Sequence, residues 1–202
     1  MKKSTQNNRS TRRTRTAIRS ALLSVMQEKP ISAITIQEII DIANVCRTTF
    51  YSHFRDIYDL AECIGDEIID EVGYALSMLQ YETNRLDEYD FPTIQSVVKI
   101  YEQNADTIRL LIGPNGDPTF RKRMEDKIYQ ITKDMRKQVY KEQFDEKRHK
   151  LYSRFVISGG INVLNTLICE EGQWDSELAA LMLAKMAAYG EEVFIGADLL
   201  KS

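Results

Sequence analysis

The apolar positions of this chain recur at helical spacing along most of its length. Ile18, Leu22 and Val25 mark one face of a first helix, expected from about Ser10 to Glu28. The Lys29-Pro30 pair ends this helix, because a residue that precedes proline is disfavoured in the helical conformation. Glycine and proline, at nine and four residues, are scarce in the whole sequence, and the pattern predicts an all-α protein.

Residues 35–60 contain the most informative local pattern. Its first part has apolar residues at helical spacing, so that they share one face of a helix: Ile36, Ile39, Ile40 and Ala43. Thr35 precedes this face and Glu38 follows three residues later, which matches a capping box at a helix start. Asn44 tolerates the left-handed conformation, so it can reverse the chain into a second short helix.

The second short helix is predicted to have an apolar inner face and an outer face of hydrogen-bonding side chains. Phe50 and Phe54 are four residues apart and point inward together. The outward positions carry groups that bond phosphates or base edges, namely Arg47, Thr48, Thr49, Tyr51 and His53. A helix-turn-helix places its second helix in the DNA major groove. An ordinary amphipathic hairpin with a polar outer face is the alternative interpretation.

Charge is divided unevenly along the chain. Residues 1–60 contain ten Lys or Arg and five Asp or Glu, whereas residues 61–202 contain seventeen and twenty-five. Seven of the basic residues lie within residues 1–19, which have no acidic residue. Such a segment attracts phosphates, so we expect Arg12 and Arg13 to add affinity for the DNA backbone. A solvated basic tail is the alternative for this segment.

These motifs resemble the tetracycline-repressor (TetR) family of bacterial regulators. The positions that carry the resemblance are Thr35-Ile36, Ile39, Ala43, Val45, Thr49-Phe50-Tyr51, His53-Phe54 and Leu60. Four positions depart from the family pattern. Asn44 replaces a Gly in the turn, and Cys46 replaces a Ser or Thr that caps the second helix. Thr48 replaces a frequent Gly, and Ile57 replaces a Lys that binds phosphate. The match covers the first third of the chain. The resemblance implies a dimer, a near-palindromic operator, and a DNA contact by Thr35 at its helix start.

Six further helices are predicted from periodicity and helix-ending residues. They run from about Ile57 to Gln80, Phe91 to Gln103, Asp106 to Gly113, Asp117 to Gln143, Glu146 to Glu171 and Asp175 to Ile195, with a loop over Tyr81 to Asp90. The motif and its arm form an expected DNA-binding domain, residues 1–56. Residues 57–202 form an expected helical domain for effector binding and dimerisation.

The last two predicted helices favour a subunit interface. The helix from Glu146 is apolar nearly all round its centre, so every side of it needs a cover. On the final helix, Leu178, Leu181, Met182, Met186 and Tyr189 are expected to point inward. Two such helices from each subunit would form a four-helix interface. Its expected residues are Gly159, Gly160, Val163, Leu164, Leu167, Leu178, Met182 and Met186. The alternative is that both helices complete the core of one subunit.

A small-molecule pocket in the second domain is implied by the resemblance. Candidate lining residues are Tyr74, Met78, Tyr101, Ile108, Met124, Ile128, Tyr129 and Phe155, each of which also suits an ordinary core. The sequence predicts no cofactor and no metal site. It contains no Ser-His-Asp set, Gly-rich phosphate loop or zinc spacing, so an enzyme is not expected. The widely spaced Cys46, Cys63 and Cys169 fit a reducing cytoplasm, and no membrane partner is expected.

The sequence therefore predicts a TetR-like DNA-binding transcriptional regulator. We expect a homodimeric repressor that a small-molecule effector releases from a double-stranded operator. Two alternatives stay open: a DNA-binding regulator that acts through a protein partner without an effector, and a helical enzyme that has kept a DNA motif.

Overall fold

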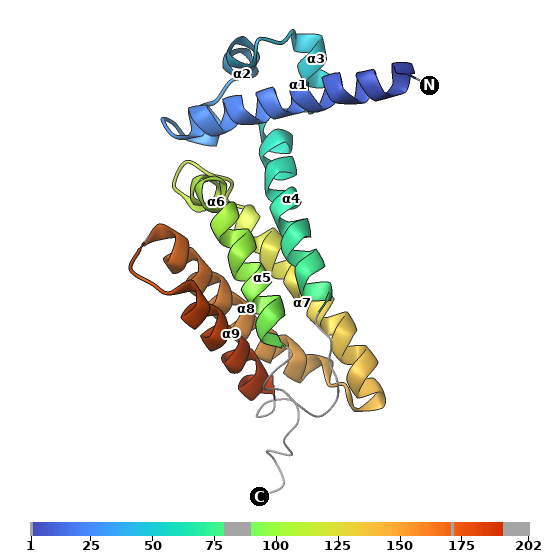
Figure 1. The fold of residues 1–202 in the computed structure, drawn as a ribbon, viewed down its shortest axis with the longest axis vertical. Helices are drawn as coiled ribbons and strands as arrows, with labels where there is room; N and C mark the ends of the chain where they lie inside the picture. Colours follow the sequence, from blue (N-terminus) through green and yellow to red (C-terminus); the bar gives the residue numbers. More distant parts are fainter. Residues whose placement is uncertain (1, 79–89, 171, 192–202) are drawn as a thin grey trace, which may run out of the picture. The chain divides into compact units, whose positions relative to one another are not determined.

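The all-α prediction is confirmed by the structure, a computed structural model that describes residues 2–78, 90–170 and 172–191 (Figure 1). Within these residues the chain forms nine α-helices and two short 3-10 helices, and no strand. The α-helices are α1 (Lys2–Met26), α2 (Ile36–Ala43), α3 (Arg47–Tyr51), α4 (Ile57–Ser77), α5 (Asp90–Gln103), α6 (Ala105–Ile112), α7 (Phe120–Tyr140), α8 (Glu146–Cys169) and α9 (Ser176–Glu191). The 3-10 helices are η1 (Ile31–Ala33) and η2 (Lys141–Gln143).

Most helices match their predicted positions within a few residues, and one end differs more. Helix α1 begins at Lys2, whereas the apolar periodicity predicts a start near Ser10. The apolar face that drove this prediction begins only at Ile18, so it gives no signal for the first turns. The predicted loop over Tyr81 to Asp90 lies almost wholly outside the described residues, as do Leu79, Gln80 and the chain beyond Glu191.

The chain forms two compact units. Unit 1 comprises Met1–Glu67 and Asp106–Phe120, and unit 2 comprises Ile68–Ala105 and Arg121–Ser202. Unit 1 is thus discontinuous in sequence, and α4 contributes residues to both units. The expected boundary at residue 57 separates a DNA-binding domain from an effector-binding domain. It concerns function, so it stays a prediction.

The core of unit 1 is built where α1, α2 and the first turns of α4 meet. Its fully buried side chains include Ile18, Leu22, Ile39, Phe50, Phe54, Leu60 and Ile64. Arg15 and Arg19 on α1 both pair with Glu67 on α4, so two of the basic residues are used within the unit. These pairs are partly exposed and therefore contribute little to stability compared with the apolar core.

A turn after α6 closes the other side of unit 1. The Asn115 amide group donates to the Met26 carbonyl (3.3 Å) at the end of α1, and the Ile31 N–H donates to the Asn115 carbonyl (2.9 Å). Gly116 is buried, and a Cβ built there would lie 2.1 Å from the Leu111 carbonyl oxygen. Only glycine fits this close approach of backbone to backbone.

Unit 2 is a bundle in which α5 packs against α8 and α9 (Figure 1). Helix α9 turns its alanine face into the bundle, through Ala179, Ala180, Ala184 and Ala188, all of which are buried. The expectation that the Leu and Met side chains of α9 point inward is therefore wrong for the single chain, and the side chain of Tyr189 lies outside the part that the structure describes. Leu178, Leu181, Met182 and Met186 are 38–62% exposed. Alanines let helix backbones approach closely, so the small face packs inside and the large face is left outside.

Candidate nucleic-acid interface

The start of α2 is held by the predicted capping box. The Glu38 N–H donates to Thr35 Oγ1 (3.3 Å), and the Thr35 N–H donates to Glu38 Oε2 (2.9 Å). Lys29 forms a close ion pair with the same carboxylate. The hydrogen bond from Lys29, followed by those from the Thr35 backbone and hydroxyl, lowers the pKa of Glu38 to about 2. The entry angle of α2 is thus set by side chains that the local sequence supplies.

Asn44 reverses the chain between α2 and α3 as predicted. It adopts the left-handed conformation, with φ 51° and ψ 52°. Its N–H and the N–H of Val45 both donate to the Ile40 carbonyl, which satisfies the open end of α2. The turn brings α3 against α2 and leaves one side of α3 in solvent.

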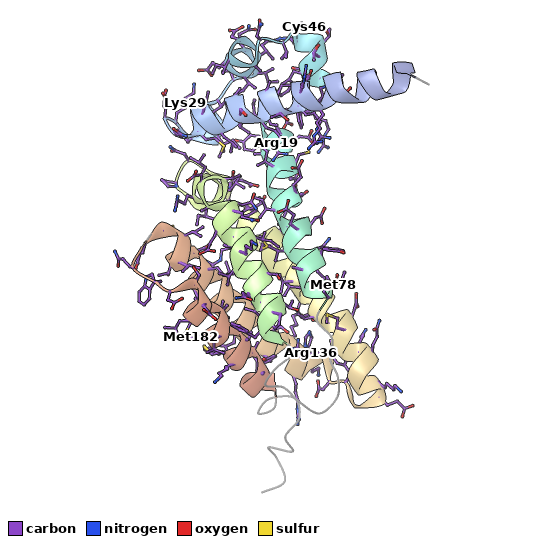
Figure 2. The ribbon with its side chains drawn as sticks, in the orientation of Figure 1. Arg19, Lys29, Cys46, Met78, Arg136 and Met182 are labelled. Carbon is purple, nitrogen blue, oxygen red and sulfur yellow. The ribbon has the colours of Figure 1, made fainter. Side chains whose placement is uncertain are left out.

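Cys46 begins α3 without capping it through its side chain. Its Sγ instead lies 3.1 Å from Thr48 Oγ1 and 2.9 Å from Thr49 Oγ1. Hydrogen bonds from these two hydroxyls lower the pKa of the Cys46 thiol to about 7. The exposed sulfur, labelled in Figure 2, therefore holds both threonine side chains at the start of the helix.

An aromatic cluster seats α3 on the core. Phe50 and Phe54 are buried with ring centroids 5.9 Å apart, and Tyr51 meets the Phe50 ring edge-on at 5.7 Å. The Tyr51 side chain remains 51% exposed, and His53 is half-buried beside Phe54. The guanidinium of Arg15 lies 5.6 Å above the Phe54 ring. The outward positions predicted from the spacing are thus the accessible ones.

The first turn of α4 differs from the family pattern for a structural reason. Asp56 accepts from the Asp59 N–H (2.8 Å) and so caps α4, and Asp59 accepts two bonds from the Arg55 guanidinium. Ile57, at the position of the family's lysine, is only 5% exposed and belongs to the core. Its apolar side chain cannot replace a phosphate-binding ammonium.

Two further basic residues lie free on the surface of α1. Arg12 and Arg13 are exposed, and neither forms an ion pair within the described part of the chain. Arg15 and Arg19 pair with Glu67, so of these four arginines two have a structural role and two are accessible.

Gln37 also contributes to this candidate site, although no pattern in the sequence analysis above indicates it. Its side-chain oxygen accepts from the Arg47 guanidinium (3.2 Å), and its nitrogen donates to Asp41 (2.8 Å). This chain of bonds orients Arg47 from the neighbouring helix. The available signal was the polar pair Gln37 and Asp41, four residues apart on the exposed face of α2.

The candidate effector residues occupy several different places. Ile128 lines a cavity of about 130 Å³ in unit 2 between α4, α5, α7, α8 and α9. Tyr101 and Met124 are buried, and Ile108 is buried within unit 1. Tyr74 (69% exposed) and Met78 line an open groove between α4 and α5, while Phe155 is 70% exposed on α8. Tyr129 is half-buried and stacks on the buried His149 ring.

Most of the candidate interface residues fall on the open face of α8 and α9. Val163, Leu167, Leu178 and Met182 line a groove of about 320 Å³ together with Trp174. Met186 is exposed, and a Cβ built at Gly159 would meet no atom within 4 Å. Gly160 and Leu164 instead line the inner cavity. One side of α8 thus lacks the cover that its apolar centre requires.

Other kinds of site find no support in the described residues. Within residues 2–78, 90–170 and 172–191, no group of three His, Cys, Asp or Glu is placed to hold a metal ion. Among the described helices, none has the length and apolar content of a membrane span.

Comparisons with known proteins agree with this architecture. Residues 91–188 match a TetR family model described as a transcriptional regulator C-terminal region. A TetR transcriptional regulator from Streptococcus agalactiae 2603V is 24% identical, with a TM-score of 0.62 over 91% of this chain and 98% of that one. The TetR family repressor AlkX from Dietzia sp. strain DQ12-45-1b, implicated in biodegradation of n-alkanes, is 14% identical, with a TM-score of 0.57 over 89% and 98%.

A putative TetR family regulator from Vibrio parahaemolyticus is 15% identical, with a TM-score of 0.52 over 86% of this chain and 97% of that one. At these identities the structural likeness shows the fold. No curated protein sequence matches this chain.

Proposed function

The chain belongs to the TetR family of transcriptional regulators, and from this premise we propose that it is a repressor that binds its operator as a homodimer and leaves it when a small molecule binds in unit 2. The observation that carries the proposal is the exposed face of α3. A capped α2, a left-handed Asn44 and a buried Phe50 present this face to solvent.

The side chains of this face suit two kinds of DNA contact. Arg47, Thr48 and Thr49 lie at the N-terminal end of the reading helix, where they would reach base edges. Tyr51 and His53 would bond phosphates and set the register, as would Thr35 at the start of α2. Arg12 and Arg13 on α1 would add contacts to the DNA backbone, which carry affinity without sequence information.

The test is a mobility shift of the full chain on DNA from its own upstream region, over a salt series. Tight binding that survives competitor DNA supports the proposal, and weak binding that collapses as salt rises contradicts it for that fragment. Replacing Arg47 with Ala should change sequence preference, with a loss of about 1–3 kcal/mol at one base pair. Tyr51→Phe with His53→Ala should weaken binding to every sequence.

Arg148→Ala is the matched control, because Arg148 is an exposed arginine of unit 2. Its operator affinity should equal that of the unchanged protein. Equal affinity in the Arg47→Ala and Tyr51→Phe/His53→Ala variants as well would overturn the assigned roles.

The dimer is proposed to form through the open face of α8 and α9. Leu178 and Met182 are exposed apolar side chains beside the groove that Trp174 borders. A second copy with the same face would bury them and approach closely at Gly159. Pairing two reading heads through such an interface is what a near-palindromic operator requires.

The repressing action is proposed to depend on the cavity of unit 2. A ligand that binds only to the dimer conformation with one particular distance between the two α3 helices shifts the dimer toward that conformation. If this distance does not match the operator, the affinity for the operator falls. The cavity at Ile128 supports such a ligand, and the neighbour AlkX is a repressor with this fold.

A further inference from the structure

Unit 2 contains an inner cavity that is apolar on nearly all sides. It measures about 130 Å³ and is lined mainly by aliphatic residues of α4, α5, α7, α8 and α9. The polar hydroxyls in its lining are already used: Thr132 Oγ1 donates within α7, and Tyr152 donates to the Ala187 carbonyl. Its lining includes one cation, the buried Arg136 labelled in Figure 2, and no carboxylate.

An outer groove of about 630 Å³ lies beside this cavity, between α7 and α8. The carboxylates of the groove already have partners, because Asp126 pairs with Lys122, and Glu125 accepts from Arg121 and Ser158. Two cations of the groove, Lys150 and Arg154, form no ion pair or side-chain hydrogen bond within the described residues, and they are one helical turn apart on α8. The groove thus has a surplus of positive charge on its α8 side.

Two side chains, Ser153 and Ile157, line both the inner cavity and the outer groove. Ser153 is small, and its Oγ lies 3.2 Å from Nε2 of His149, whose ring is held between Tyr129 and Phe144. Ser153 and Ile157 therefore form part of the wall between the two spaces.

We propose that unit 2 binds a small monocarboxylate across this wall, with its apolar body in the inner cavity and its carboxylate between Lys150 and Arg154. The ligand class deepens the effector role proposed above and rests on it. A dry cavity of about 150 Å³ accepts a molecule the size of benzene, so the inner space suits an apolar body of about six carbons. The unpaired cations select an anionic end group and disfavour an amine.

The head-group test is calorimetric titration of the full chain, without DNA, with hexanoate, 1-hexanol and hexylamine. Hexanoate should bind about tenfold more tightly than 1-hexanol, and hexylamine should not bind. Lys150→Gln with Arg154→Gln should lower hexanoate affinity by about tenfold and leave 1-hexanol unchanged. The control pair Lys99→Gln with Lys147→Gln removes the same charge from exposed positions outside the groove and should bind hexanoate normally.

A second experiment tests whether the apolar body of the ligand lies in the inner cavity, by filling that cavity with larger side chains. A Cβ at Gly160 would meet only Leu183 Cδ2, at 3.7 Å, so Gly160→Ala fits and Gly160→Leu occupies more of the space. Hexanoate affinity should fall stepwise from the unchanged protein to Ala to Leu, and thermal melting checks that each variant is folded. Equal affinity for hexanoate and 1-hexanol, or equal affinity across the Gly160 series, would overturn the proposal.

Separate results would contradict the proposed ligand site and the proposed effector role. Absence of hexanoate binding overturns the site even when the protein binds its operator tightly. Hexanoate binding by a protein that releases no operator in a mobility shift overturns the effector role of the site.

Discussion

At the residue scale, the DNA-reading region depends on a few side chains that act on backbone close in sequence. Thr35 and Glu38 cap α2, Asn44 turns the chain, and Asp56 caps α4, and all four roles follow from local spacing. The bonds that join α2 to α3 are different. The contact of Gln37 with Arg47 depends on how two helices pack, and no spacing within one helix predicts it.

Asn44 provides the first prediction. A side chain other than Asn or Gly in the left-handed conformation costs about 1–2 kcal/mol, and a β-branched one costs the most. Asn44→Val should therefore lower the free energy of unfolding by about that amount, measured by urea titration. Asn44→Gly is the matched variant and should be neutral within about 0.5 kcal/mol, because glycine adopts this conformation freely. Equal losses in both variants would show that the asparagine side chain, and not the conformation, matters.

Glu38 provides a prediction for pH dependence. Its pKa in the folded chain is about 2, below the ordinary value of 4.5, so the folded state favours the ionised carboxylate. The stability that this carboxylate contributes is complete above about pH 4.5 and is lost as the pH falls toward 2. Thermal melting across this range should show a steeper loss for the unchanged protein than for Glu38→Gln. If the melting temperatures of the two proteins fall equally with pH, the Glu38 cap is not the cause of the loss.

At the element scale, helix positions were predictable and the facing of one helix was not. Helix α9 has apolar residues on two faces, and periodicity alone does not say which face packs within the chain. Its alanines pack inward because they allow close approach to α5 and α8, and this preference depends on partners far away in sequence. In the same way, nothing local in the sequence predicts which candidate effector residues line a cavity, since that depends on how five helices meet.

The turn after α6 provides a prediction at this scale. Gly116→Ala would bring a Cβ against the backbone of Leu111, and backbone atoms cannot move aside cheaply. We expect a loss of about 2 kcal/mol or more in the free energy of unfolding, together with weaker operator binding. Pro114→Ala, an exposed change in the same turn, should cost less than about 1 kcal/mol. Urea titration of both variants tests the difference, and equal costs would contradict the close approach.

At the scale of the whole molecule, the exposed face of α8 and α9 provides the prediction. Leu178→Glu with Met182→Glu would place two carboxylates in the proposed interface, where they have no partner and lose their water. Sedimentation should show a monomer, and operator affinity should fall by at least about tenfold. Lys99→Glu changes the net charge by the same two units on exposed α5 and should remain a dimer. A dimeric double variant would place the subunit contact elsewhere.

The discontinuity of unit 1 has a consequence for synthesis on the ribosome. Chains emerge from the N-terminus at about 5–20 residues per second, and a domain with continuous sequence can fold as soon as its last residue appears. Unit 1 is completed only by Asp106–Phe120, after residues 68–105 have emerged. A nascent chain that ends at residue 67 therefore carries the reading helix but lacks the Asn115 contact with the end of α1. The DNA-reading part of this protein becomes complete only after part of its second unit has been made.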